Sequence, residues 1–189
     1  MEQTNEAYAL AKISGVKSCE YIREQFGKDF SSLMPTNLYG PRDNFDLETS
    51  HVLPALITKF HTAKMENHKP VTLWGTGSPK REFLHVNDLA RAVLFSLEND
   101  LPENLYNIGV GEDISIFDLA ILIQKIVGHE GEIHWDSEKP DGTPRKLLDV
   151  SKMSNLGWKA EIKLEDGIKS TYDWYLENSM NLKMVKINN

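Results

Sequence analysis

Short apolar segments alternate with longer amphipathic segments along almost the whole chain. Apolar residues with helical spacing lie at 5–27, 51–66, 89–97, 115–128, 151–157 and 164–176, and short apolar runs typical of strands lie at 30–35, 71–74, 81–86, 105–108 and 133–136. Because strands that alternate with helices of this length usually pair in parallel, the pattern predicts an α/β fold. Segment 36–41 follows a strand and is expected to contain a turn at Gly40-Pro41, and segments 42–50 and 139–146 are expected to be loops.

Three helix starts carry side chains that suit an N-cap, whose oxygen accepts a free backbone N–H of the first turn. Asn87 or Asp88 is predicted to cap the helix at 89–97, Ser115 the next helix and Ser151 the short helix at 151–157. Gly27 is predicted to end the first helix, since glycine readily adopts the conformation that stops one.

Charge and composition narrow the classes of partner. The 189 residues include 21 Lys and Arg and 28 Asp and Glu, and the net charge of -7 argues against nucleic acid or an anionic membrane as the main partner. No apolar run approaches the roughly 20 residues of a membrane span, and residues 1–6 lack the features of a signal peptide. The single cysteine, Cys19, cannot form an internal disulfide, so a cytoplasmic location is expected. No metal site is predicted.

Tyr8 and Lys12 lie four residues apart in the first predicted helix, so their side chains share one face. A nearby ammonium favours the phenolate form, which makes such a tyrosine a proton donor and acceptor near neutral pH. The same spacing also arises by chance between ordinary surface residues. A dimer face is indicated on this helix by small residues that would let another helix approach, namely Ala11, Ser14, Gly15 and Ser18.

One expected feature is absent. A dinucleotide-binding α/β domain usually carries Gly-x-Gly-x-x-Gly after a strand, where backbone N–H groups and a helix N-terminus hold the pyrophosphate. The 12 glycines of this chain follow no such pattern. If Tyr8 and Lys12 form a catalytic pair, the chain is therefore expected to begin in the middle of a longer fold.

Several further segments occur in one order with the Tyr-x-x-x-Lys pair. They are Met34-Pro-Thr-Asn-Leu-Tyr-Gly-Pro41, Ser50-His-Val-Leu-Pro-Ala-Leu56, Leu73-Trp-Gly-Thr-Gly77, Arg81-Glu-Phe-Leu-His-Val86 with Asp88, and Lys139-Pro-Asp-Gly-Thr-Pro-Arg-Lys-Leu-Leu-Asp149. Together, from Tyr8 to about Asn178, they resemble the GDP-L-fucose synthase family, epimerase-reductases among the extended short-chain dehydrogenase/reductases. The tyrosine-lysine pair and the Arg81–Val86 segment are shared across extended reductases and sugar-nucleotide epimerases, whereas 51–56 and 139–146 are specific to this family.

The resemblance implies the C-terminal part of an extended short-chain dehydrogenase/reductase: a partial Rossmann-type parallel sheet with a small α/β substrate-binding lobe. Residues 1–50 would be the C-terminal part of the NADP-binding Rossmann domain. Residues 51–178 would be mainly the substrate-binding lobe, with 80–110 partly returning to the Rossmann sheet, and 179–189 a polar tail. A homodimer through the helix of Tyr8 and Lys12 is implied as well.

The implied activity is epimerisation and NADPH-dependent reduction of GDP-4-keto-6-deoxy-D-mannose to GDP-L-fucose. By resemblance, Tyr8 would stabilise the enolate oxygen and later donate a proton, Lys12 would support Tyr8 and bind the nicotinamide ribose, and His51 would be an acid/base. The implied NADP-binding residues are Tyr8, Lys12, Pro35, Thr36, Asn37, Leu38 and His51. The implied GDP-sugar residues are Lys59, Trp74, Arg81, Asp141 and Lys146.

Several of these residues also have a plainer interpretation. His51 could be a polar residue at a helix N-terminus with Ser50 as the cap, Trp74 a core residue on a strand, and Asp141 a turn former. Lys59 departs from the family, where an arginine is expected. Among the other histidines, His85 is expected to be a structural hydrogen-bonding residue, and the remaining ones are expected to be surface or incidental residues: His61, His68, His129 and His134.

The family's glycine fingerprint, a serine that shares the ketone contact and a cysteine that partners the acid/base histidine all precede the matching segments. Cys19 follows Tyr8 on the apolar side of the helix, so a buried structural thiol is predicted instead. The 189-residue chain alone is therefore expected to have little or no synthase activity. Two alternatives stay open: another NAD(P)-dependent nucleotide-sugar epimerase or dehydratase, and a non-catalytic GDP-sugar-binding or oligomerisation module.

Overall fold

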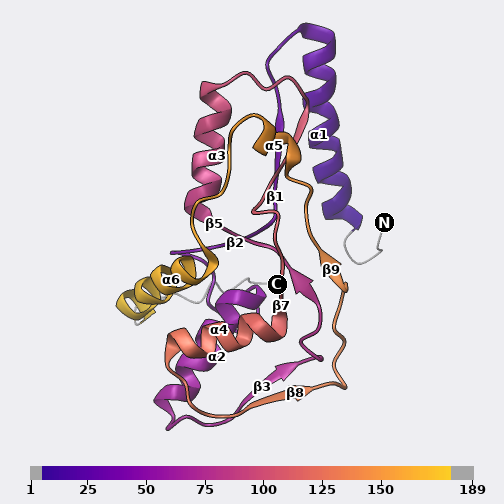
Figure 1. Ribbon diagram of the computed structural model, residues 1–189. Coiled ribbons are helices and arrows are strands. Elements are labelled where there is room, and N and C mark those ends of the chain that lie inside the picture. Colours follow the sequence, from indigo (N-terminus) through magenta and orange to yellow (C-terminus); the bar gives the residue numbers. More distant parts are fainter. Residues whose placement is uncertain (1–5, 180–189) are drawn as a thin grey trace.

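The computed structural model describes residues 6–179, so the predicted polar tail lies almost wholly outside the described residues. The helices are α1 (Glu6–Phe26), α2 (Val52–Met65), α3 (Val86–Glu98), α4 (Ile116–Val127), α5 (Ser151–Asn155) and α6 (Leu164–Asn178) (Figure 1). The strands are β1 (Ser32–Pro35), β2 (Asn37–Tyr39), β3 (Val71–Trp74), β4 (Lys80–Arg81), β5 (Phe83–His85), β6 (Leu105–Ile108), β7 (Ile114–Ser115), β8 (Ile133–Asp136) and β9 (Arg145–Lys146).

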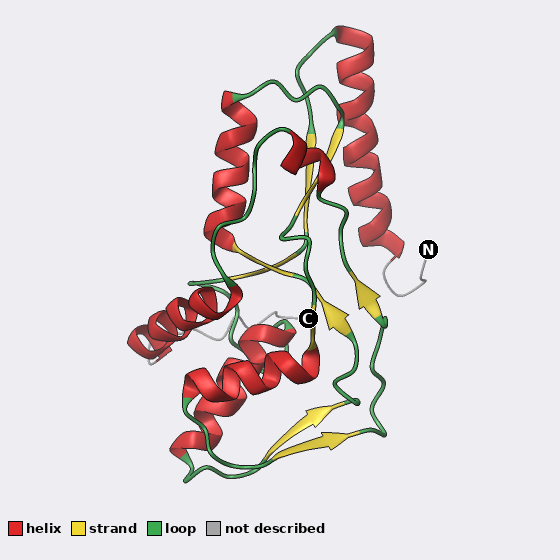
Figure 2. Cartoon of the chain, viewed as in Figure 1, coloured by secondary structure: helices red, strands yellow, loops and turns green. Residues whose placement is uncertain are grey.

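The strand pairing confirms an α/β fold with mainly parallel strands. The pairs β1–β6, β2–β5, β3–β8 and β4–β9 are parallel, and β4–β7 is antiparallel. Each parallel pair joins strands that are distant in sequence, as expected where helices connect them. The β2–β5 pair crosses the middle of the molecule, between the β1–β6 pair at the top of the view and the β3–β8 pair at the bottom (Figure 2).

Two hydrophobic cores form on either side of β2 and β5. The larger core lies among α2, α4, α6 and β3 and includes the fully buried Ile57, Phe60, Leu119, Ile123 and Ile168. The smaller core joins β5 and β6 to α3 and α5 and includes the fully buried Leu84, Ala92, Ile108 and Met153.

The predicted caps are correct for one helix and wrong for two. Ser115 caps α4, because its Oγ accepts from the Asp118 N–H at 2.9 Å. His85, rather than Asn87 or Asp88, is the N-cap of α3, and its Nδ1 accepts from the Asn87 N–H at 3.2 Å, which confirms a structural role for His85. Ser151 is the first residue of α5 rather than its cap, and Asp149 Oδ1 accepts its N–H.

Three segments differ from their predicted type. The expected strand at 81–86 is interrupted at Glu82, because this buried residue bonds outside the ladders of β4 and β5. The expected turn segment at 36–41 and the expected loop at 139–146 contain β2 and β9, because distant strands supply their partners. Such pairing cannot be recognised in runs of only two or three residues.

Helix α1 has no buried residue, so the prediction of a buried Cys19 is wrong; the thiol is partly exposed. The helix is held mainly at its C-terminal end, where Arg23 donates to the Leu101 carbonyl at 2.6 Å and to Asp29 at 3.1 Å (Figure 1). Apolar side chains along α1 therefore stay exposed, including Tyr8, Leu10, Ile13, Tyr21 and Phe26. Whether this helix forms a dimer face stays a prediction.

The prediction that the remaining histidines are surface or incidental residues is wrong for His61, His68 and His129; His68 Nδ1 accepts from the Glu130 N–H at 2.9 Å. His129 is buried against Phe60 and stacks on the ring of His68, with a centroid separation of 5.6 Å in each case. His61 Nδ1 lies 3.0 Å from the Tyr172 hydroxyl, in the contact between α2 and α6. Within residues 6–179, no helix is long and apolar enough to cross a membrane.

Candidate active site

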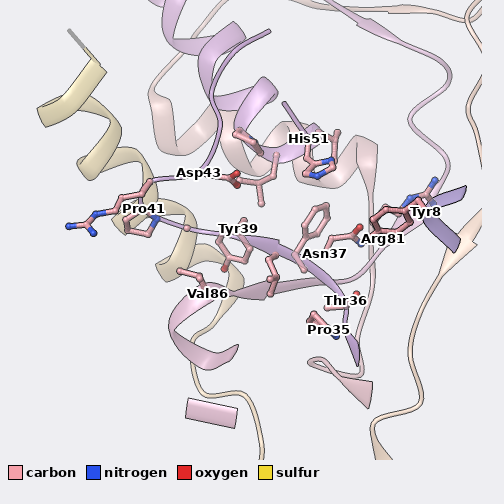
Figure 3. A pocket seen from close by; sticks show the side chains of 17 residues that line it. Tyr8, Pro35, Thr36, Asn37, Tyr39, Pro41, Asp43, His51, Arg81 and Val86 are labelled. Atoms are coloured by element: carbon pink, nitrogen blue, oxygen red, sulfur yellow. The ribbon is translucent and has the colours of Figure 1, made fainter. Parts of the chain in front are cut away.

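A cavity of about 760 Å³ lies between the β1–β2 connection, the start of α2 and the start of α1 (Figure 3). It brings together seven of the residues singled out in the sequence, from α1, the β1–β2 segment, the residue before α2, and β4: Tyr8, Pro35, Thr36, Asn37, Leu38, His51 and Arg81. Tyr8 and His51, which can transfer protons, therefore face the same cavity as the Arg81 guanidinium. This combination suits chemistry on an anionic substrate.

The wall formed by residues 35–38 is held by hydrogen bonds to β6 and to Glu82, at the break between β4 and β5. The Thr36 N–H donates to the Ile108 carbonyl at 2.9 Å. The Thr36 hydroxyl and the Asn37 amide both donate to the Glu82 carbonyl, at 3.3 and 2.8 Å. This segment is thus a firm surface at the carboxyl end of β1, where ligands of α/β sheets usually bind.

Tyr8 and Lys12 share a face of α1, as their spacing predicts. Lys12 Nζ lies 5.3 Å from the centroid of the Tyr8 ring, so the ammonium faces the ring rather than bonding to the hydroxyl. Tyr8 lines the cavity and is 62% exposed, whereas Lys12 is not among the lining residues.

His51 occupies the N-cap position of α2 and faces the cavity from the wall opposite Asn37 (Figure 3). The idea that Ser50 caps this helix is wrong, because no side chain caps α2 and Ser50 Oγ is buried without a hydrogen-bond partner among the described residues. The His51 side chain makes no capping hydrogen bond, and its imidazole is exposed and faces the cavity.

A smaller cavity of about 190 Å³ adjoins the first and shares Arg81 with it. Trp74 and Asp141 line it as well. Trp74 is 69% exposed, so its interpretation as a core residue is wrong, and Lys139 Nζ lies 5.6 Å from its ring centroid. An exposed indole beside a guanidinium can cover a flat base or sugar face while the cation binds phosphate.

Asp141 is both a tether and a cavity residue. Its carboxylate accepts from the Thr76 N–H at 2.7 Å and from the Thr76 hydroxyl at 2.8 Å, which ties the 139–146 segment to the turn after β3. Gly75 makes this contact possible, because a Cβ there would lie 2.2 Å from Asp141 Oδ1. The two interpretations of Asp141 are therefore compatible.

The two remaining lysines differ in placement. Lys146 on β9 is exposed and lies opposite Arg81 of β4 in the parallel register, so two cations are neighbours at this edge. Lys59 lies in neither cavity; its Nζ points to the Thr72 carbonyl at 3.4 Å, and burial lowers its pKa. Among the described residues, no group of three or more His, Cys, Asp and Glu side chains could hold a metal ion.

Asp43 also lines the larger cavity, and no sequence pattern singled it out. It follows Arg42, a non-glycine residue in the left-handed region at φ 69°, a conformation associated with functional sites. Burial raises the pKa of the Asp43 carboxyl, and the Asn44 N–H and the charge of His51 partly oppose this rise.

The raised pKa of Asp43 predicts a pH-dependent effect of the isosteric change Asp43→Asn. Because the folded chain binds this proton more tightly than the unfolded chain does, the contribution to stability is present at acid pH and lost as pH rises through the folded pKa. At pH 7 the variant should gain about 0.5 kcal/mol, or roughly 2 °C in Tm. Below the ordinary pKa of an aspartate the gain should vanish. Thermal melts at pH 3 and pH 7 measure both values, and an equal gain at both would contradict the assignment.

Residues 1–109 match the NAD dependent epimerase/dehydratase family, which is more than half of the chain. The chain belongs to this family. GDP-L-fucose synthase 1 of Arabidopsis thaliana is 55% identical over 181 residues, which cover 96% of this chain and 56% of that protein. GDP-L-fucose synthase of Escherichia coli is 51% identical over 187 residues, covering 94% of this chain and 58% of that protein. This epimerase/dehydratase chain thus spans a little over half the length of these curated relatives.

Solved structures agree with the fold. A GDP-L-fucose synthetase from Naegleria fowleri superposes with a TM-score of 0.87 at 34% identity, covering 95% of this chain and 57% of that one. A UDP-glucose 4-epimerase from Thermotoga maritima superposes with a TM-score of 0.79 at 25% identity, covering 91% and 54%. The architecture is therefore that of nucleotide-sugar enzymes of the extended reductase type, and family membership indicates a nicotinamide cofactor.

Proposed function

We propose that this chain carries the tyrosine-lysine helix and the nucleotide-sugar lobe of a GDP-L-fucose synthase. The observation that carries the proposal is the position of Arg81, which lines both the cavity of Tyr8 and His51 and the cavity of Trp74 and Asp141. One bound nucleotide sugar could thus place its diphosphate at Arg81, its base near Trp74 and its sugar near Tyr8.

In this proposal, Tyr8 donates a hydrogen bond to the 4-keto oxygen of the sugar. An enolate forms when a base removes the proton beside the ketone, and the bond from Tyr8 stabilises the negative oxygen. His51, on the opposite wall, is the acid that returns a proton to ring carbon. Tyr8 then gives its own proton to the oxygen when the ketone is reduced, and Lys12 supports the resulting phenolate.

The nicotinamide cofactor is proposed to be NADP. Its nicotinamide end fits against residues 35–38, whose positions are fixed by the bonds to Ile108 and Glu82. Bound NADPH supplies the hydride for the reduction. The residues of this chain contain no glycine-rich pyrophosphate loop, so we expect slow or no NADPH oxidation when the 189-residue chain is given GDP-4-keto-6-deoxy-D-mannose.

The GDP moiety is proposed to bind through Trp74, Arg81, Asp141 and Lys146. Arg81 offers a planar, two-pronged contact and Lys146 a point charge to the diphosphate. Lys59 would join them only after leaving the Thr72 carbonyl. A cytoplasmic location and a homodimer formed through α1 complete the proposal; the exposed apolar side chains of α1 support the latter.

Titration calorimetry of the 189-residue chain with GDP, GDP-L-fucose and UDP-glucose tests the proposal. Both GDP ligands should bind at one site per chain, and Trp74 should report their binding by fluorescence quenching. The change Trp74→Ala should abolish the quenching and weaken binding about tenfold, as expected for a lost stacking contact.

The three classes of function predict different ligand preferences in these titrations. Preference for UDP-glucose would favour another nucleotide-sugar epimerase, which the TM-score of 0.79 to such an enzyme makes the second candidate. A folded chain that binds none of the three ligands would contradict both and leave an oligomerisation module.

A further inference from the structure

Glu82 is a fully buried carboxylate for which the proposed reaction has no use. It lies between Arg81 and Phe83, at the break between β4 and β5. Oε1 accepts from the N–H groups of Val110 and Gly111, at 2.6 and 2.7 Å, and Oε2 accepts from the Leu148 N–H at 3.1 Å. A buried charge of this kind is costly unless it is fully bonded, so three backbone donors indicate a specific placement.

The chain after β6 is shaped to receive this carboxylate. Gly111 has φ 82°, and the two successive N–H groups at 110 and 111 converge on one oxygen, as in a backbone anion site. Gly109 leaves room for the side chain, because a Cβ at that position would lie 2.3 Å from Glu82 Oε1. The carboxylate thus fills a site made by backbone, much as a bound anion would.

The other bonds of Glu82 lead to the two sides of the candidate active site. Its carbonyl accepts from Thr36 and Asn37, which line the cavity of Tyr8. Through Oε2 it holds Leu148, two residues after Lys146, which lies opposite Arg81 in the β4–β9 register. The bond from Leu148 leads inward to Glu82, and the next residue, Asp149, is held at the surface by the Asn107 amide, which donates to its carbonyl at 3.0 Å.

We propose that Glu82 is a positioning residue for nucleotide-sugar binding: its carboxylate fixes the 147–148 segment and thereby places Lys146 beside Arg81. The inference rests on the proposed function, because it takes the diphosphate of a GDP-sugar to be the ligand of Arg81 and Lys146. Glu82 itself is buried and does not touch the ligand.

The change Glu82→Gln tests this placement with little change of shape. The amide oxygen can keep the bonds to Val110 and Gly111, but the amide NH₂ then faces the Leu148 N–H, so two donors meet. Amide exchange followed by NMR should therefore speed up by about tenfold or more at Leu148 and much less at Val110 and Gly111. The exposed Glu98→Gln serves as control and should leave all three rates unchanged. Unchanged exchange at Leu148 in Glu82→Gln would overturn the inference, whether or not the chain binds GDP.

A double-mutant cycle on GDP affinity separates positioning from general loss of stability. Glu82→Gln should raise the Kd for GDP about tenfold in the natural chain but by less than about twofold in a Lys146→Ala background, because Glu82 acts through Lys146. Lys59→Ala, on the separate helix α2, is the control background. There Glu82→Gln should raise the Kd for GDP by the same factor as in the natural chain, so that the effects of the two changes multiply. Multiplicative effects with Lys146→Ala would overturn the inference.

A second variant covers the case in which Glu82→Gln does not fold. Leu148→Pro removes the donor at the far end of the bond, along with fixing φ at 148 and restricting residue 147, and leaves the carboxylate with its other two partners. It should raise the Kd for GDP by a similar factor, and normal affinity in a folded Leu148→Pro chain would contradict the role of this bond. A natural chain that binds no GDP would instead contradict the proposed function, while Leu148 exchange still decides the role of Glu82.

Discussion

Replacement of Asp88 by alanine is expected to lower the free energy of unfolding by about 3 kcal/mol, which corresponds to a fall in Tm of roughly 10 °C. The carboxylate of Asp88 is fully buried on α3. Oδ2 accepts from the N–H groups of Glu161 and Ile162, at 3.1 and 2.9 Å, and Oδ1 pairs with Arg91 at 2.7 Å. Alanine leaves the two partly buried N–H groups without their acceptor and removes one of the two carboxylates that pair with Arg91, the other being that of Glu161.

Thermal and urea denaturation of the 189-residue chain measure this effect. Asp173→Ala is a matched control, because Asp173 is also an aspartate within a helix but is exposed, and such a change should alter stability by less than about 0.5 kcal/mol. Asp88→Asn should fall between the two, since one oxygen remains to accept a bond. A loss in Asp88→Ala no greater than in the control would show that these bonds contribute little to the fold.

The bonds of Asp88 also show why part of the fold was accessible from sequence and part was not. Periodicity and glycine position predicted the helices and most strands, because both signals act within a few residues; Gly27 and Gly128, for example, end α1 and α4 with positive φ. Asn87 or Asp88 was expected to cap α3, yet the backbone N–H groups that Asp88 accepts from lie more than 70 residues away. The rules for helix ends suggest a backbone N–H of α3 as the partner of Asp88, whereas in the folded chain its carboxylate accepts from backbone N–H groups of a segment distant in sequence.

The candidate site was likewise predictable from the sequence only in part. Arg81, Trp74 and His51 were singled out because their segments resemble a known family, and the structure brings all three to adjoining cavities. Glu82 stands next to Arg81 in the same segment, but nothing local indicates that its partners are the backbone donors of Val110, Gly111 and Leu148. Backbone donors leave no residue-type signal, so such contacts are invisible in a single sequence.

The exposure of α1 could not be predicted from the sequence of the helix alone. Apolar residues on a helix predict burial, but burial needs a facing surface, and the two-stranded β1–β6 pair offers little of one. The apolar side of α1 therefore remains available for association, whereas the apolar side of α2, which faces α4, is buried. Apolar residues on one side of a helix therefore predict burial correctly only where another element packs against that side.

Replacement of Arg81 by alanine is expected to weaken GDP binding about 30-fold, which corresponds to roughly 2 kcal/mol for a lost charged hydrogen-bonding contact. Arg81 is partly buried, lines both cavities and stands beside Lys146, so its guanidinium is the group best placed for a diphosphate. Arg81→Lys should recover only part of the affinity, because an ammonium cannot make the planar two-pronged contact.

The adjacent Arg145 provides a matched control for this prediction. It lies opposite Lys80 in the same strand pair, but its Nε is paired with Asp113 at 2.5 Å and it lines neither of the two cavities. Arg145→Ala should therefore change the Kd for GDP by less than about threefold. Guanosine has no phosphate, so its binding reports contacts to the nucleoside alone. Arg81→Ala should leave the binding of guanosine nearly unchanged. Trp74→Ala should weaken the binding of both guanosine and GDP. Equal losses for GDP and guanosine in Arg81→Ala would mean that the guanidinium supports the shape of the cavity rather than contacting the diphosphate.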